Sequence, residues 1–119
     1  MKNKISIINI QNNAVLADKV RVANTPLSRL IGLLNRKSLE QGEALILRPS
    51  CSIHTLFMRF TIDVLFLDRQ GKVIAVFPSF KPFRFSPAYF NAYFTVELPE
   101  HTLKLTQTQP GDMIKITPD

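Results

Sequence analysis

The feature that most constrains this fold is a pair of short apolar runs separated by a turn. Residues 64–67 and 73–77 are apolar at every position, whereas a strand with one face in water alternates apolar and polar residues. The connecting residues 68–71, Asp-Arg-Gln-Gly, suit a type I turn that ends in a left-handed glycine. We therefore predict a β-hairpin over residues 62–77 that is covered on both faces. Its buried side chains are expected to include Val64, Phe66, Val73 and Val76.

Other strand-like segments accompany this hairpin. They cover residues 44–48, 52–58, 93–98 and 113–117. Pro110-Gly111 fits the centre of a type II turn before the last of them. Near the start, residues 5–7 and 15–22 are predicted to pair through a turn at Asn12-Asn13, because asparagine tolerates positive φ.

One helix is predicted, beginning at Pro26 behind a cap at Asn24 or Thr25. Apolar residues recur at helical spacing and form a stripe that we expect to pack on the sheet. The stripe comprises Leu27, Leu30, Ile31 and Leu34. Gly32 interrupts it and indicates either close packing or an early end of the helix.

The balance of strands and helix predicts the fold class. A parallel sheet needs a crossover helix for each strand pair, and those helices are missing. The economical arrangement places a second sheet on one face of the hairpin and the helix on part of the other. We predict a mainly β fold, an antiparallel β-sandwich or squashed barrel with one short α-helix packed on it. No linker or repeat divides residues 1–119, which are expected to form a single domain.

Composition narrows the class of protein. The chain has 119 residues, of which 45% are hydrophobic, and this fraction excludes a disordered chain. Its four glycines and one cysteine exclude a collagen-like or disulfide-dense chain. The net charge of +6 is spread without runs of Lys or Arg, so we expect only weak, sequence-independent binding to nucleic acid. Cys51 is the single cysteine and favours a reducing, cytoplasmic location. No apolar stretch approaches the ~18 residues of a membrane span, and no export signal is recognised.

Polar residues that could carry chemistry are densest from Ser50 onwards. If residues 52–58 form a strand, alternation puts His54 and Met58 on one face and points Cys51 away from them. A Cys–His nucleophile pair would then need a bulge or turn at Ser50 to bring its two members together.

Asp63 is unusual because it lies in an otherwise apolar strand. A carboxylate there needs a partner, such as Arg59 or Arg36, or a set of backbone N–H donors. It is therefore either a structural anchor or a catalytic base. His54, Asp63 and Cys51 would be the ligands of a metal ion, but the close ligand pairs of zinc sites are missing, so no metal and no other cofactor is predicted.

The block from Ile53 to Val73 carries a recognisable pattern. It reads Ile53-His54-Thr55, Met58-Arg59-Phe60, Ile62-Asp63-Val64, Phe66-Leu67-Asp68 and Gly71-Lys72-Val73. With these motifs the sequence resembles the uncharacterised family called domain of unknown function 192. The flanking matches are Arg29, Gly32-Leu33, Arg36, Ala44-Leu45, Pro49, Glu97-Leu98 and Gly111-Asp112, so the resemblance covers most of the chain.

The resemblance implies a compact β-rich domain of bacteria and archaea, without an established activity, cofactor or catalytic residue. The sequence departs from the family pattern at Glu100-His101, where relatives tend to have a small residue or glycine after Glu-Leu-Pro. It also lacks the export signal with which members often begin, so an exported location does not carry over.

An aromatic loop follows the hairpin. Residues 78–87 interleave Phe80, Phe83 and Phe85 with Lys81 and Arg84, and three prolines stiffen them. Such a loop can close the open end of a sandwich, or it can line a groove where aromatic rings stack on bases.

Three functions remain open from the sequence. The first is a non-catalytic binding or accessory module with a groove near His54 for a peptide, a protein or a small anionic ligand. The second is a small hydrolase or lyase that uses His54 and Asp63, and the third is a weak single-stranded nucleic-acid binder. The predicted ligand site joins His54, Met58 and Asp63, with Arg36 or Arg59 supplying positive charge.

Overall fold

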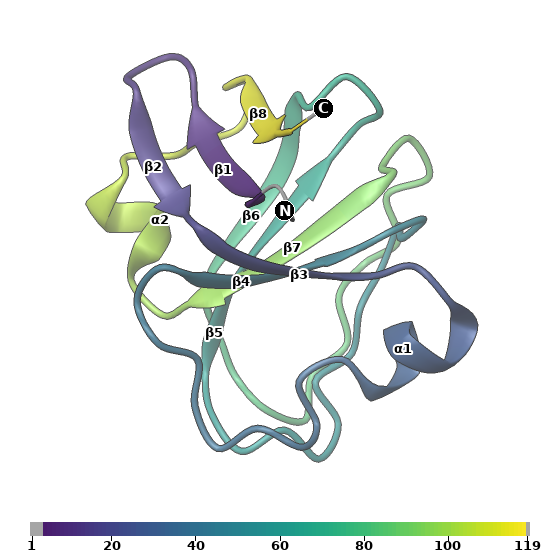
Figure 1. Cartoon of the computed structure of the whole chain (residues 1–119). Helices are drawn as coiled ribbons and strands as arrows, with labels where there is room; N and C mark the ends of the chain where they lie inside the picture. The colour runs from purple at the N-terminus through teal and green to yellow at the C-terminus, as the bar shows by residue number, and fades with distance from the viewer. Residues whose placement is uncertain (1–3, 119) are drawn as a thin grey trace.

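The computed structural model describes residues 4–118, which form two β-sheets and short helices (Figure 1). The three-stranded sheet has the order β2-β1-β8 and the five-stranded sheet the order β3-β4-β7-β5-β6. The strands are β1 (Ser6–Asn9), β2 (Ala14–Ala17), β3 (Lys19–Ala23), β4 (Glu43–Leu47), β5 (Ile62–Leu67), β6 (Val73–Phe80), β7 (Phe94–Pro99) and β8 (Ile114–Thr117), and the helices are α1 (Pro26–Ile31) and α2 (Thr102–Leu105). The fold is therefore mainly β and sandwich-like, as predicted, and the two sheets do not close into one barrel within the described part of the chain.

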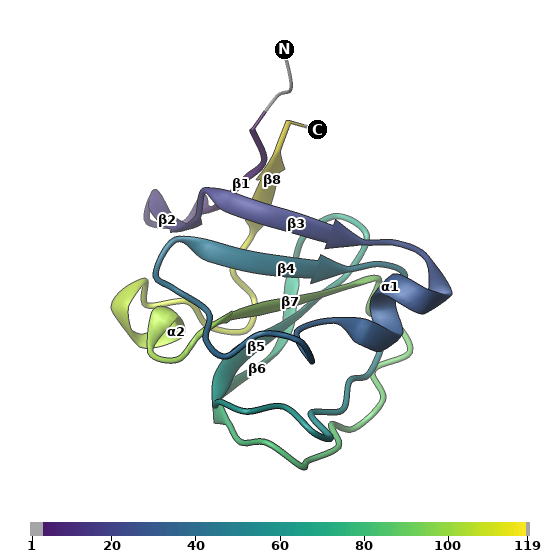
Figure 2. The same ribbon diagram turned by 60° about the horizontal axis from the view of Figure 1, so that its bottom comes forward.

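Strand alternation divides the core into two layers. On β5, Leu65 and Leu67 point into a cluster shared with Ile7 of β1, between the two sheets. Val64 and Phe66 point to the opposite face, into a cluster shared with residues of the loops that lie beneath the five-stranded sheet in Figure 2. The central strand is consequently buried at all six positions, which confirms the sequence prediction for β5.

The hairpin has the predicted turn. Gly71 has φ +95° and receives the backbone of Ile114 so closely that a Cβ would collide with the Ile114 carbonyl oxygen, so only glycine fits there. Val64, Phe66 and Val73 are buried, but β6 is at the edge of the sheet, and Val76 is only half-buried. The prediction that both hairpin strands are covered on both faces is therefore correct for β5 and wrong for most of β6.

One strand pair runs parallel within this mostly antiparallel fold. β3 pairs with β4 in parallel, and residues 24–42, which include α1, make the crossover between them. The predicted strand over residues 15–22 is in fact two strands, because the chain leaves the three-stranded sheet at Asp18 and enters the five-stranded one.

The helix begins as predicted but packs differently. Thr25 caps α1, since its hydroxyl accepts from the Ser28 amide, and the helix ends at Gly32 with φ +48°. Most of the apolar stripe is not packed on the sheet: Leu27 and Leu30 are 65% and 61% exposed, and Leu34 is the member that packs against the core. Leu33, just beyond the helix, enters the core in their place.

Residues 52–58 do not form the predicted strand. They make one isolated bridge, between His54 and Phe85, and Phe57 has φ +64°. This irregular segment is hydrogen-bonded to residues 81–86 through Ile53 and Thr55, and its Ile53 and Met58 side chains join the core cluster on the lower face of the sheet. The short helix α2 was not predicted. Within residues 4–118, no helix is long and apolar enough to cross a membrane.

Candidate functional site

A cavity of about 250 Å³ opens on the lower face of the five-stranded sheet. Its walls come from the end of α1, from β4 and β7, and from the segment after β4. Most of its lining is apolar and includes Leu30, Leu33, Leu47, Ile53 and Met58. Its polar side chains are Arg29, Ser50, Cys51, Ser52, His54 and Glu97. An apolar hollow with a few convergent polar groups is the usual form of a small-molecule site.

Glu97 is the most unusual of these residues. It pairs with Val64 of β5, and side chains of directly paired residues share a face, so its carboxyl group lies on the cavity side of the sheet. The residue is only 4% exposed, and Oε1 has no hydrogen-bond partner among the described residues. Burial without compensation raises the pKa of this carboxyl group from 4.5 to about 8. At neutral pH Glu97 is therefore an uncharged acid that can donate a hydrogen bond.

Thr95 lies two residues earlier on the same face and makes a useful contrast. It is fully buried, and its hydroxyl is 2.7 Å from Ser50 Oγ. Ser50 also donates to the Ser52 carbonyl oxygen. The fold therefore satisfies one buried polar group on this strand and leaves Oε1 of its neighbour Glu97 without a hydrogen-bond partner among the described residues.

His54 is oriented by its own backbone. The Leu56 amide donates to His54 Nδ1 at 3.3 Å, so a neutral imidazole carries its proton on Nε2. The ring packs beside Phe85, with 6.2 Å between ring centroids. In this state His54 offers a donor at Nε2, and not the free acceptor that a general base needs.

Cys51 and His54 line the same cavity, although regular alternation predicted that they point apart. The prediction was wrong because residues 51–55 are irregular: the Tyr89 amide donates to the Cys51 carbonyl oxygen, and Ser86 binds the backbone of Ile53. No hydrogen bond joins the Cys51 and His54 side chains in the described part of the chain.

Asp63 lies on the other face of the sheet. It pairs with Leu98, which belongs to the core between the two sheets. Its Oδ1 accepts from the Ser79 amide at 2.9 Å and its Oδ2 from the Leu103 amide at 2.8 Å. Asp63 thus ties β6 and α2 to β5 through backbone donors. The expected convergence of His54 and Asp63 in one concavity is not present, because the sheet separates them.

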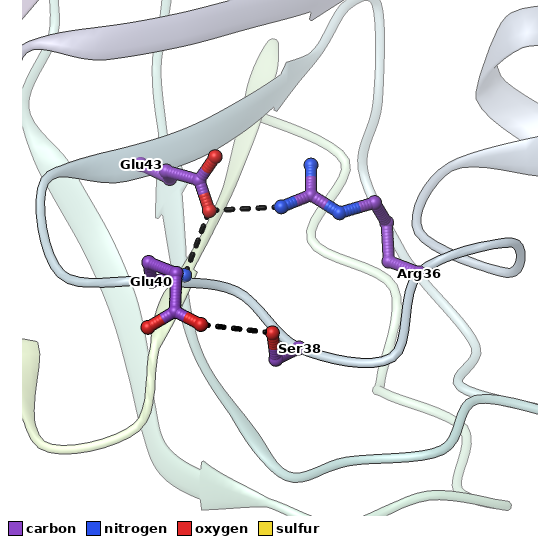
Figure 3. A network of polar contacts seen from close by, with 4 residues as sticks. All are labelled: Arg36, Ser38, Glu40 and Glu43. Atoms are coloured by element: carbon purple, nitrogen blue, oxygen red, sulfur yellow. Dashed lines mark hydrogen bonds and ion pairs between the residues drawn. The ribbon is translucent and has the colours of Figure 1, made fainter.

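The two arginines expected at the site do not line the cavity either. Arg36 donates to Glu43 Oε1 at 2.8 Å, and Figure 3 shows this pair beside a second contact between Ser38 and Glu40. The Glu40 amide also donates to Glu43, and this hydrogen bond, followed by Arg36, lowers the pKa of the Glu43 carboxyl group. Arg36 therefore fastens the loop before β4. Arg59 is exposed, and the cation that does line the cavity is Arg29.

Of the predicted site residues, the structure brings together His54 and Met58 and leaves out Asp63, Arg36 and Arg59. Sequence reasoning missed Glu97, although it carries the same signal as Asp63, an acidic residue inside an apolar strand. Within residues 4–118 no group of three or more metal-ligating side chains gathers.

Comparison with known proteins identifies the family. Residues 7–116 match the model of domain of unknown function 192, described as "Uncharacterized ACR". The chain belongs to domain of unknown function 192. It is 31% identical over 116 residues to a UPF0127 protein of Thermococcus kodakarensis, covering 94% of this chain and 73% of the relative.

Solved structures of two other proteins share the fold of this chain. A protein of unknown function from Novosphingobium aromaticivorans superposes with a TM-score of 0.81 at 17% identity, covering 94% of this chain and 83% of the other. A protein of Sinorhizobium meliloti whose given name proposes a transcription regulator superposes with a TM-score of 0.80, also at 17% identity, covering 95% and 92%. At this identity the similarity shows the fold alone.

Proposed function

We propose that this member of domain of unknown function 192 is a non-catalytic binding module whose cavity takes a small anionic ligand with an apolar body. The observation that carries the proposal is Glu97, a buried acid whose Oε1 has no partner among the described residues and which lines an apolar hollow. Unpaired buried polar atoms are rare in folded proteins, and each calls for an explanation. A bound ligand supplies the missing partner.

The donors around the cavity favour an anion. Glu97 is protonated at neutral pH, His54 presents Nε2–H, and Arg29 carries a permanent positive charge. All three donate hydrogen bonds, and a carboxylate accepts them. The apolar lining suits a short hydrocarbon body, and the volume favours a small molecule over a peptide.

A reaction at His54 and Asp63 is not part of this proposal. The two residues lie on opposite faces of the sheet, and both oxygens of Asp63 accept backbone hydrogen bonds. The free thiol of Cys51, which lines the cavity, is consistent with the cytoplasmic location that we also propose.

The test is calorimetric titration with octanoate and with octylamine, after native mass spectrometry of the fresh protein for any retained ligand. Octanoate is expected to bind at pH 7. Its apparent affinity should fall about tenfold between pH 7 and pH 9, because ionisation of Glu97 removes a donor and adds a repelling charge. Glu97→Gln keeps a neutral donor and should abolish this pH dependence.

Two further variants separate recognition from stability. His54→Ala should weaken octanoate binding without lowering Tm, because the imidazole is only half-buried. Glu100→Gln, three residues beyond Glu97 and partly exposed, should behave like the wild type. Tighter binding of octylamine than of octanoate, or a pH dependence that survives Glu97→Gln, would contradict the proposal.

A further inference from the structure

The loops after β4 and after β6 lie at the end of the molecule away from the chain termini (Figure 2), and they carry exposed aromatic side chains. Three of them, Phe57, Phe83 and Phe85, are 74%, 56% and 70% exposed, and we call these three the aromatic tip. Phe57 and Phe83 contact each other with 5.6 Å between ring centroids, and Phe85, two residues after Phe83, packs beside His54. Exposed apolar side chains are normal when scattered singly, but a contiguous group marks an interaction surface.

The aromatic tip is held rigidly. Thr55, which is fully buried, links the two loops that carry it. Its amide donates to the Arg84 carbonyl oxygen at 2.9 Å, and its carbonyl oxygen accepts from the Phe83 amide at 2.9 Å. Its hydroxyl donates to the Lys81 carbonyl oxygen and accepts from the Arg84 amide. The rings are therefore presented by an ordered scaffold and do not belong to a loose loop.

The backbone conformation of the aromatic tip is a second, independent indication of an interaction surface. Phe57 has φ +64° and Phe83 has φ +62°, a region that bulky residues rarely occupy. Strained conformations of this kind persist where the surrounding structure imposes them, and they concentrate at functional sites. In these conformations the two phenyl rings point towards solvent, so they do not contribute to the packing of the core.

Charge around the tip identifies the kind of partner. Arg59, Lys81 and Arg84 are exposed and lie within two residues of Phe57 or Phe83 along the chain, and none has an acidic partner within residues 4–118. The two chain segments that supply the tip, residues 44–62 and 69–96, contain no Asp or Glu. Apolar side chains flanked by unpaired cations match the interface of an anionic membrane, where rings enter the headgroup layer and cations meet phosphate.

We propose that the aromatic tip docks this protein on anionic lipid surfaces, as a peripheral contact. A single-stranded nucleic acid fits less well. Stacking on successive bases needs ring faces that follow one track, but the Phe57 and Phe83 rings are inclined by 73° to each other. Each cation near a membrane surface strengthens binding by about fivefold, so the three together supply about 100-fold.

The experiment measures co-sedimentation of the full chain with vesicles of phosphatidylcholine containing one quarter phosphatidylglycerol, and with vesicles of phosphatidylcholine alone. Binding is expected only to the anionic vesicles, at least tenfold above the neutral ones, and it should weaken at about 0.5 M NaCl. The triple variant Phe57→Ser/Phe83→Ser/Phe85→Ser should lose it. So should Arg59→Gln/Lys81→Gln/Arg84→Gln, which leaves the rings intact if the first variant folds poorly.

Phe90→Ser is the matched control. Phe90 is 90% exposed but lies beside Asp68 and Arg69, away from the tip, so its removal should leave vesicle binding unchanged. The proposal is overturned if the charge variant binds anionic vesicles like the wild type, or if Phe90→Ser loses as much binding as the tip variant. It is also overturned if a dT oligonucleotide binds more tightly than the vesicles and the same substitutions abolish that binding.

Discussion

Replacing Glu97 by glutamine should remove a specific dependence of stability on pH. The folded-state pKa of Glu97 is about 8 and its ordinary value is 4.5. Between these values the folded protein keeps a proton that the unfolded chain releases, so protonation-linked stability is complete below pH 4.5 and is lost as the pH rises towards 8. The free energy of unfolding of the wild type therefore falls by about 1.4 kcal/mol per pH unit across this window because of Glu97.

The magnitude follows from the size of the shift. Above pH 8 the loss attributable to Glu97 reaches about 5 kcal/mol, and at pH 7 it is about 3 kcal/mol. Glutamine has nearly the same shape as glutamate and cannot ionise. The free energies of unfolding of the variant and the wild type therefore differ by a constant plus the pH-dependent loss attributable to Glu97. The difference in free energy of unfolding between variant and wild type should therefore grow steadily from pH 5 to pH 8.

Urea denaturation followed by far-UV circular dichroism at several pH values between 5 and 9 measures this difference. All other ionisable groups are common to both proteins and cancel in it. Glu100→Gln serves as the control, because Glu100 is partly exposed, and its difference from the wild type should not follow the same slope. If the wild type and Glu97→Gln give parallel pH profiles, Glu97 is not a buried neutral acid and the reasoning about the cavity fails.

Two further substitutions test the core and the sheet. Phe66→Ala should lower the free energy of unfolding by about 3 to 5 kcal/mol, because the ring is fully buried beside Phe77 and Tyr89; a loss below about 1 kcal/mol in urea denaturation would contradict its burial. Asp63→Asn should cost about 2 to 3 kcal/mol, since one of the Ser79 and Leu103 amides then faces an NH₂ group. An unchanged urea midpoint for Asp63→Asn would show that these two hydrogen bonds do not anchor β6 and α2.

Local patterns were sufficient for the hairpin and its turns. Continuous apolar sequence predicted the fully buried β5, and the glycine after Asp-Arg-Gln predicted the positive φ of Gly71. The same reasoning failed for residues 52–58, because their composition suits a strand while long-range hydrogen bonds from Ser86 and Arg84 hold them irregular. It failed also for the face of α1, since periodicity gives the spacing of apolar residues but not whether another surface covers them.

The candidate site shows the same division between local and long-range information. Asp63 and Glu97 are each a single acid in an apolar strand, and the sequence offers no local distinction between them. Their environments differ because Asp63 pairs with Leu98 and Glu97 with Val64, which places them on opposite faces. Only the packing of α2 on one face and of the loops on the other decides which acid receives donors.

The energetic contrast between these two acids is the strongest support for the proposed ligand site. The fold provides two amides for Asp63 and a hydroxyl for Thr95, but Glu97 Oε1 has no partner among the described residues. An unsatisfied buried polar group costs about 1 to 3 kcal/mol even when uncharged, a large part of the stability of a small protein. A ligand that pairs with Glu97 would recover this loss as part of its binding free energy, and would raise stability by an amount that grows with its concentration. A position that destabilises the empty protein is thus one where a bound ligand would stabilise it, which is the property expected of the proposed recognition site.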